Sequence, residues 1–233
     1  SGNIGGAKVT AGRQYFKVGS GYTADLTGDA VKVDFGNVLK ATAFYGRFDS
    51  DTESTSSAST SLKDNDVYGL GLSYDVADNV IFKAAYYGVD GSNDLTFPVV
   101  DRDIYTVGLG YNFSDDLSLY GEYLKASDEL VAGYSDDGWA ATLAYKGAKA
   151  SKAGSWGLYG TYYDQSGATI IDHVSEGAAD FKFNKQGIKG YELGLGYTFA
   201  KNIVGEVSYY DLESKDGADT DNKMLWSRVT FSF

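Results

Sequence analysis

The stretch Tyr105-Thr106-Val107-Gly108-Leu109-Gly110-Tyr111-Asn112-Phe113 alternates between two kinds of side chain. Its odd-numbered positions are apolar or aromatic, and its even-numbered positions are small or polar. Successive side chains of a β-strand point to opposite faces of the sheet, so this stretch predicts a strand with one apolar and one polar face. Residues 68–74 and 191–199 repeat the pattern. The repetition predicts a series of similar strands along the chain.

Twelve segments of the chain show this period of two. They are residues 7–13, 30–35, 39–48, 67–76, 80–88, 104–113, 117–125, 139–146, 156–164, 190–199, 203–211 and 225–233. Short connections alternate with long ones along the chain, as outer-membrane barrels show on their periplasmic and extracellular rims. The sequence thus predicts an all-β fold, a transmembrane antiparallel β-barrel of twelve strands. We expect residues 1–233 to form a single domain.

Aromatic side chains stand near the ends of the predicted strands, on their apolar face. Two aromatic girdles around an apolar band are typical of membrane barrels. A soluble sheet also alternates, but here its solvent face would consist of Gly, Ser, Thr and scattered charge. A water-filled lumen explains both faces. The predicted girdle residues are Tyr68, Tyr74, Tyr105, Tyr111, Trp139, Tyr145, Trp156, Tyr162, Tyr191 and Tyr197.

Composition excludes several classes of protein. The formal net charge of −12 argues against a nucleic-acid partner, because phosphate binding needs clustered Lys and Arg. The chain has no cysteine, which excludes disulfides, thiolate metal sites and cysteine nucleophiles. The sequence contains no run of 18 apolar residues, so it predicts no transmembrane helix. We expect no cofactor.

The last segment, Leu225 to Phe233, alternates up to its final phenylalanine. It resembles the terminal β-signal that bacterial outer-membrane proteins present to their assembly machinery, here carried by Trp226, Val229, Phe231 and Phe233. We expect this segment to pair with the first one, residues 7–13. An unpaired strand edge facing lipid would leave its backbone groups without hydrogen bonds.

Two N-terminal stretches carry a further resemblance: Val9-Thr10-Ala11-Gly12-Arg13-Gln14 and Val31-Lys32-Val33-Asp34-Phe35-Gly36-Asn37. Together with the strand pattern they resemble the trimeric general porins of bacterial outer membranes. The nearest are the porins of diderm Firmicutes that carry a surface-layer-homology domain (OmpM type). The resemblance implies that residues 14–29 are an extracellular loop that folds into the pore and narrows it.

The same resemblance implies a sixteen-stranded parent in which the first segment is the fifth strand. The chain is then an N-terminally truncated barrel without about four strands and a periplasmic anchoring domain; alternatively, its twelve strands close by themselves. The implied location is the bacterial outer membrane. The implied partners are outer-membrane lipid and lipopolysaccharide, the barrel assembly machinery, small hydrophilic solutes and a homotrimer.

Charged residues occur on the predicted inward face. They are Lys8, Lys32, Asp34, Lys40, Lys83, Glu122, Lys146, Glu192, Glu206 and Arg228. Opposed basic and acidic walls would create a transverse field in a pore, although charges could also simply keep a lumen wet. The basic cluster on the first three segments predicts one wall of a constriction, joined by Arg228 if the barrel closes. Arg13, whose direction is open, and Asp25 or Asp29 of the loop would lie nearby.

Other candidate chemistry is weaker. The acidic groups Asp49, Asp51, Glu53 and Asp216, Asp219, Asp221 lack the spacing of a calcium loop, which favours solvated loops.

The only histidine, His173, lies in the middle of a predicted loop, whereas a Ser-His-Asp site needs one held near a nucleophile. We therefore predict a porin for passive diffusion of small hydrophilic solutes and ions, and not an enzyme. The alternatives are a structural, tethering or plugged barrel without transport and, less favoured, a barrel hydrolase.

Overall fold

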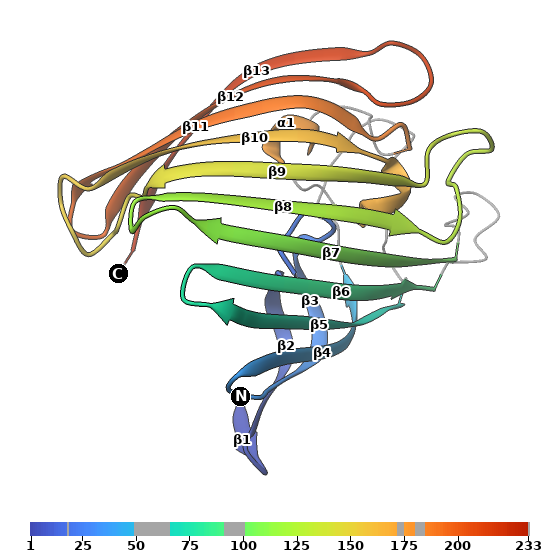
Figure 1. Ribbon diagram of the computed structural model, residues 1–233, viewed down its shortest axis with the longest axis horizontal. Coiled ribbons are helices and arrows are strands. Elements are labelled where there is room, and N and C mark those ends of the chain that lie inside the picture. Colours follow the sequence, from blue (N-terminus) through green and yellow to red (C-terminus); the bar gives the residue numbers. More distant parts are fainter. Residues whose placement is uncertain (18, 49–65, 91–100, 172–174, 180–184, 233) are drawn as a thin grey trace.

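The computed structural model describes residues 1–17, 19–48, 66–90, 101–171, 175–179 and 185–232. Within these ranges thirteen strands form one antiparallel sheet, in which every strand pairs with its neighbours in the sequence (Figure 1). The strands are β1 Gly2–Ile4, β2 Ala7–Lys17, β3 Asp25–Phe35, β4 Leu39–Phe48, β5 Asp66–Ala77, β6 Val80–Val89, β7 Arg102–Asn112, β8 Leu117–Ala126, β9 Asp137–Lys146, β10 Trp156–Gln165, β11 Ile188–Ala200, β12 Ile203–Ser214 and β13 Asp221–Phe231. Two short helices, η1 (Gly167–Thr169) and α1 (Glu176–Ala179), lie between β10 and β11. No helix in the described ranges is long and apolar enough to cross a membrane.

The predicted all-β antiparallel fold is confirmed, and the bounds of β4 agree with those predicted. The strand count is thirteen in the described residues rather than twelve, because β1 forms a small hairpin with the start of β2. Gly5 and Gly6 make its turn with φ of 56° and 86°, a left-handed conformation that glycine adopts without a steric cost. The short turns β5–β6, β7–β8 and β11–β12 lie at one end of the strands, together with the longer β9–β10 connection, and the β8–β9 and β12–β13 connections lie at the other end (Figure 1).

The strands β2 and β3 are longer than predicted. Residues 14–17 and 25–29, expected in a loop, continue the ladder, with Arg13 opposite Asp29 and Lys17 opposite Asp25. The alternation is hidden here because polar and charged residues occur on both faces. The connection that remains between the two strands is short.

Aromatic residues of the outward face form a row near each end of the strands. Trp139 and Tyr162 stack with ring centroids 5.3 Å apart near the end with the long connections. Tyr145 and Trp156 lie 5.8 Å apart near the other end. This is the arrangement expected of two girdles, and their contact with lipid stays a prediction.

Lys146 corrects one assignment. The alternation predicts that it faces inward, but its φ of 57° turns the chain at the end of β9. Its Nζ lies 5.2 Å and 5.0 Å from the ring centroids of Tyr145 and Trp156, on the girdle side. A long cationic side chain can thus cover the rings while its head reaches the polar rim.

The expected pairing of the first segment with the last is wrong for the described residues. The sheet order runs from β1 to β13 without a ladder between β2 and β13. Part of the β2 edge, at Ala7–Val9, is occupied by β1 instead. The sheet nevertheless curls, since Tyr15 of β2 and Arg228 of β13 line one cavity.

Candidate functional site

The connection between β2 and β3 folds against the inner face of the sheet, as the resemblance implies. Ser20 Oγ donates a hydrogen bond of 2.6 Å to Glu122, and Tyr22 Oη lies 2.6 Å from Thr142 Oγ1. Both partners belong to the wall across from β2 and β3. Tyr22 and Thr23 are buried. We call this segment, residues 19–24, the first inner loop.

A second segment also enters the interior. After β10, residues 166–171 pass through η1, and Ala168, Thr169 and Ile171 are buried. The Ile171 N–H donates to the carbonyl of Thr23 over 2.9 Å, which joins this second inner loop to the first. The sequence prediction missed it and placed these residues in an extracellular loop. The signal was the apolar pair Ile170-Ile171, unusual in a solvated loop.

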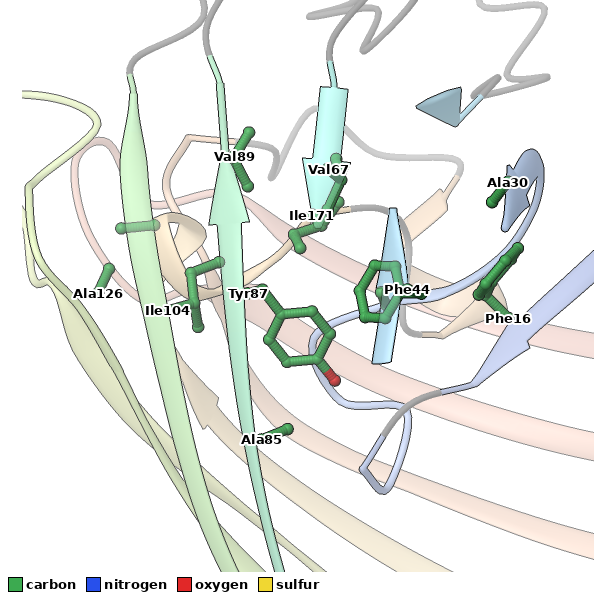
Figure 2. Packing of buried hydrophobic residues seen from close by; sticks show 12 residues of the cluster. Phe16, Ala30, Phe44, Val67, Ala85, Tyr87, Val89, Ile104, Ala126 and Ile171 are labelled. Atoms are coloured by element: carbon green, nitrogen blue, oxygen red, sulfur yellow. The ribbon is translucent and has the colours of Figure 1, made fainter. Parts of the chain in front are cut away.

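Apolar side chains fill the space between the two inner loops and the β4–β8 wall. Figure 2 shows the rings of Phe44 and Tyr87 beside each other, with Phe16 and Ile171 at their flanks. The ring centroids of Phe44 lie 5.7 Å from Phe16 and 6.1 Å from Tyr87. Close packing of this kind leaves little room for water. On this side the interior is therefore filled.

A cavity of about 390 Å³ remains beside the β10–β13 wall. Its lining residues are Tyr15, Tyr159, Ser175, Glu176, Glu192, Glu206, Ser208, Tyr210, Trp226 and Arg228. Three carboxylates face one guanidinium in this lining, so its formal charge is negative. The lining is thus polar, in contrast to the apolar packing on the β4–β8 side.

The charged groups of the cavity are held by their neighbours. Arg228 donates from Nη2 and Nε to Glu206 Oε2, over 2.7 Å and 3.1 Å. Glu192 accepts hydrogen bonds from Tyr159 and, over 2.9 Å, from Tyr163. Hydrogen bonds to a carboxylate satisfy the polar atoms that burial would otherwise leave unpaired. The charged side chains of this wall are therefore held in defined positions.

The helix α1 brings the third carboxylate, that of Glu176, to the cavity. Asn222 Nδ2 donates to the Gly177 carbonyl over 3.0 Å and fastens α1 to the inner face of β13. A Cβ at Gly177 would come within 2.5 Å of the Tyr210 ring, so glycine permits this close approach. The position of Glu176 follows from these contacts.

The predicted basic cluster lies on the inner face of β2–β4, with carboxylates of its own. Lys32 Nζ is 3.4 Å from Asp34, and Lys40 Nζ is 3.3 Å from Asp75. Lys8 stands opposite Asp34 in the ladder. The cluster is thus mixed in sign. Ser20 and Tyr22 of the first inner loop make their hydrogen bonds to the opposite wall instead.

The remaining predicted constriction residues divide between the two faces. Lys83 faces inward, and its Nζ donates to the Gly19 carbonyl over 3.4 Å. Arg13 and Asp29 form a 3.6 Å ion pair on the outward face, so their assignment to the pore is wrong. Arg13 and Asp29 are the sequence neighbours of the inward-facing Gln14 and Gly28, and neighbouring residues of a strand point to opposite faces. The backbone of Asp25 lies in β3, but its side chain lies outside what the structure describes.

The residues of the predicted assembly signal lie on both faces of β13. Trp226 lines the cavity, whereas Val229 and Phe231 are 53% and 58% exposed on the outward face. Phe233 lies outside the described residues. Their recognition by assembly machinery stays a prediction.

Other candidate groups do not assemble into a site. Asp49, Asp51, Glu53 and His173 lie outside the described residues. Asp216 accepts hydrogen bonds from the backbone and hydroxyl of Ser135. Across the described ranges, no three His, Asp or Glu side chains stand close enough to hold a metal ion.

Comparisons with known proteins bear on this fold. The structure is similar to the crystal structure of Pseudomonas aeruginosa OccK5 (OpdH), with a TM-score of 0.59 and 13% identity over 99% of this chain and 69% of that one. Its similarity to P. aeruginosa OprD has a TM-score of 0.48, with 18% identity over 91% of this chain and 58% of that one. At 13% identity the likeness to OccK5 supports the fold alone. A comparison with curated protein sequences gives no match.

The sequence itself matches a family model. Residues 3–129, more than half of the 233, match the model described as Gram-negative porin. The match covers β2–β8, and with them the first inner loop and the wall residue Glu122 that it contacts. The chain belongs to the Gram-negative porin family.

Proposed function

We propose that this porin forms a water-filled channel through the outer membrane for passive diffusion of small hydrophilic solutes and ions. The observation that carries the proposal is the cavity beside β10–β13, which is lined by Glu192, Glu206 and Arg228. The outward face of the same strands is apolar and aromatic, as lipid contact requires. Membership of a porin family favours a channel over a barrel hydrolase.

The finer parts of the proposal rest on different observations. The exposed Val229 and Phe231 on the last strand support recognition by the barrel assembly machinery. The two rows of aromatic residues fit an outer membrane with lipopolysaccharide in one leaflet. The homotrimer and the surface-layer-homology type of porin rest on the resemblance of residues 9–14 and 31–37.

We assign the inward-facing charged residues to the wall of this channel. They are Lys8, Lys32, Asp34, Lys40, Lys83, Glu122, Glu192, Glu206 and Arg228. Because both signs are present, an electric field across the lumen would orient polar solutes. The cavity beside β10–β13 supports passage along Glu192, Glu206 and Arg228.

One specific observation favours a second candidate, a plugged barrel. The two inner loops are hydrogen-bonded to each other and pack on the wall. If they occlude the lumen completely, the protein has a structural role and does not transport.

Planar-bilayer recording separates these two candidates. The refolded protein is expected to insert with stepwise current increases and to prefer cations, because three carboxylates and one guanidinium line the cavity. Heat-dependent gel mobility serves as the control for a folded barrel. A sample that shows this mobility but stays electrically silent would contradict the channel and support the plug.

A further inference from the structure

Arg102 is a buried arginine at the start of β7, on the inner face of the wall. It stands opposite Val89 in the ladder and is 7% exposed. A guanidinium carries its charge at all ordinary pH values, and burying it is costly unless hydrogen bonds compensate. The cavity beside β10–β13 does not include this residue. Its buried guanidinium must therefore be stabilised by contacts outside this cavity.

The guanidinium reaches the second inner loop. Arg102 Nε donates to the Ala168 carbonyl over 2.8 Å, and Nη2 donates to the Ile170 carbonyl over 2.9 Å. These carbonyls lie within η1 and at its end, where backbone acceptors lack helical partners. Two bonds from one rigid fork fix both the place and the orientation of the segment. The loop is thus clamped to the wall from β7.

The clamp extends to the first inner loop. Ile171 is the residue after the clamped carbonyl of Ile170, and its N–H bonds the carbonyl of Thr23. Gln165, just before the loop, donates from Nε2 to the carbonyl of Tyr22. Ile171 also packs in the apolar cluster with Tyr87 (Figure 2). Hydrogen bonds from Gln165 and Ile171 therefore join the second inner loop to the first.

We propose that Arg102 is the positioning residue that sets the width of the channel, by holding the second inner loop on β7 and, through it, the first inner loop in the interior. The inference rests on the proposed function for its conductance readout. Arg102 does not line the cavity, so its effect on transport is indirect. It determines how much of the lumen the loops leave open.

The test compares Arg102→Met with Arg47→Met in planar bilayers. Methionine keeps much of the side-chain volume but donates no hydrogen bond. In Arg102→Met the two charge-assisted hydrogen bonds to the second inner loop are lost. The channel is then expected to spend an about ten-fold larger fraction of time at a higher conductance level. Arg47 bonds Asp66 over 2.8 Å on the outward face, so its replacement removes the same charge from the other side of the sheet.

A cross-link provides the second arm. The chain has no cysteine, so Thr23→Cys with Ile171→Cys introduces the only thiols. Combined with Arg102→Met, the oxidised pair is expected to restore the lower conductance level, and a reductant to release it. Arg102→Lys is expected to rescue only in part, because one ammonium cannot form the same fork.

Two results would overturn the inference. One is a folded Arg102→Met protein whose conductance levels match those of the wild type. The other is unchanged hydrogen exchange of the Ile171 amide in that variant, a measurement that needs no conduction. If the wild type conducts nothing while Arg102→Met exposes the Ile171 amide to exchange, the channel proposal fails and the clamp stands.

Discussion

Replacing Glu206 with lysine is expected to abolish the cation preference of the channel. Glu206 is bonded to Arg228 over 2.7 Å in the cavity lining. The substitution places two cations side by side and balances the lining at two positive and two negative groups. The ratio of potassium to chloride permeability, from reversal potentials in a salt gradient, should fall about ten-fold at low ionic strength.

Two controls accompany this variant. Glu213→Lys makes the same charge change in the same strand, but on the outward face, where Glu213 lies 3.8 Å from Lys189. Its reversal potential should match that of the wild type. The effect of Glu206→Lys should also shrink in 1 M salt, where screening acts within about 3 Å. A selectivity unchanged by Glu206→Lys would show that ions do not pass along this wall.

The substitution Gly187→Ala is expected to destabilise the fold strongly, although it adds a single methyl group. Gly187 has φ of 71°, and an added Cβ would lie 2.2 Å from the Gln165 carbonyl oxygen and 2.6 Å from the Gly167 nitrogen. Both are backbone atoms at the base of the second inner loop. Left-handed strain and overpacking together should cost about 3 kcal/mol or more. Denaturant unfolding in detergent micelles, followed by tryptophan fluorescence, measures the loss.

Two other glycines separate the causes of this loss. Gly133 has φ of 85° but nothing within 4 Å of an added Cβ, so Gly133→Ala should cost about 1 kcal/mol from strain alone. Gly121→Ala, with its nearest atoms at 4.0 Å, should be close to neutral. Equal stabilities of the Gly187 and Gly133 variants would show that the backbone contacts at Gly187 yield without cost.

The regular strands could be predicted from sequence because their two faces differ in chemistry along their whole length. The segment 39–48 alternates throughout, and its bounds agree with β4. The same rule failed near the rims. Arg13 and Asp29 are charged yet face outward, because side chains at a membrane boundary can reach headgroups and water.

Contacts between distant segments could not be predicted from the period of the sequence. Glu122 was predicted to face inward, but nothing near it in the chain indicates that Ser20 bonds it. Arg102 lies outside the predicted strand 104–113, and nothing in the sequence around it indicates its contact with Ala168. The pair Ile170-Ile171 was the one available sign that a second loop is buried.

The contacts of the first inner loop carry a consequence for the order of folding. Tyr22 bonds Thr142 and Gln165, which lie 120 and 143 residues further along the chain. Contacts between residues so far apart close large loops of chain and form late. The interior is therefore narrowed last, after β8–β10 are in place. Until then the inner face of the growing sheet is open to solvent. Phe44 and Tyr87 remain in contact with water, because the apolar residues that cover them in the folded protein are not yet in place.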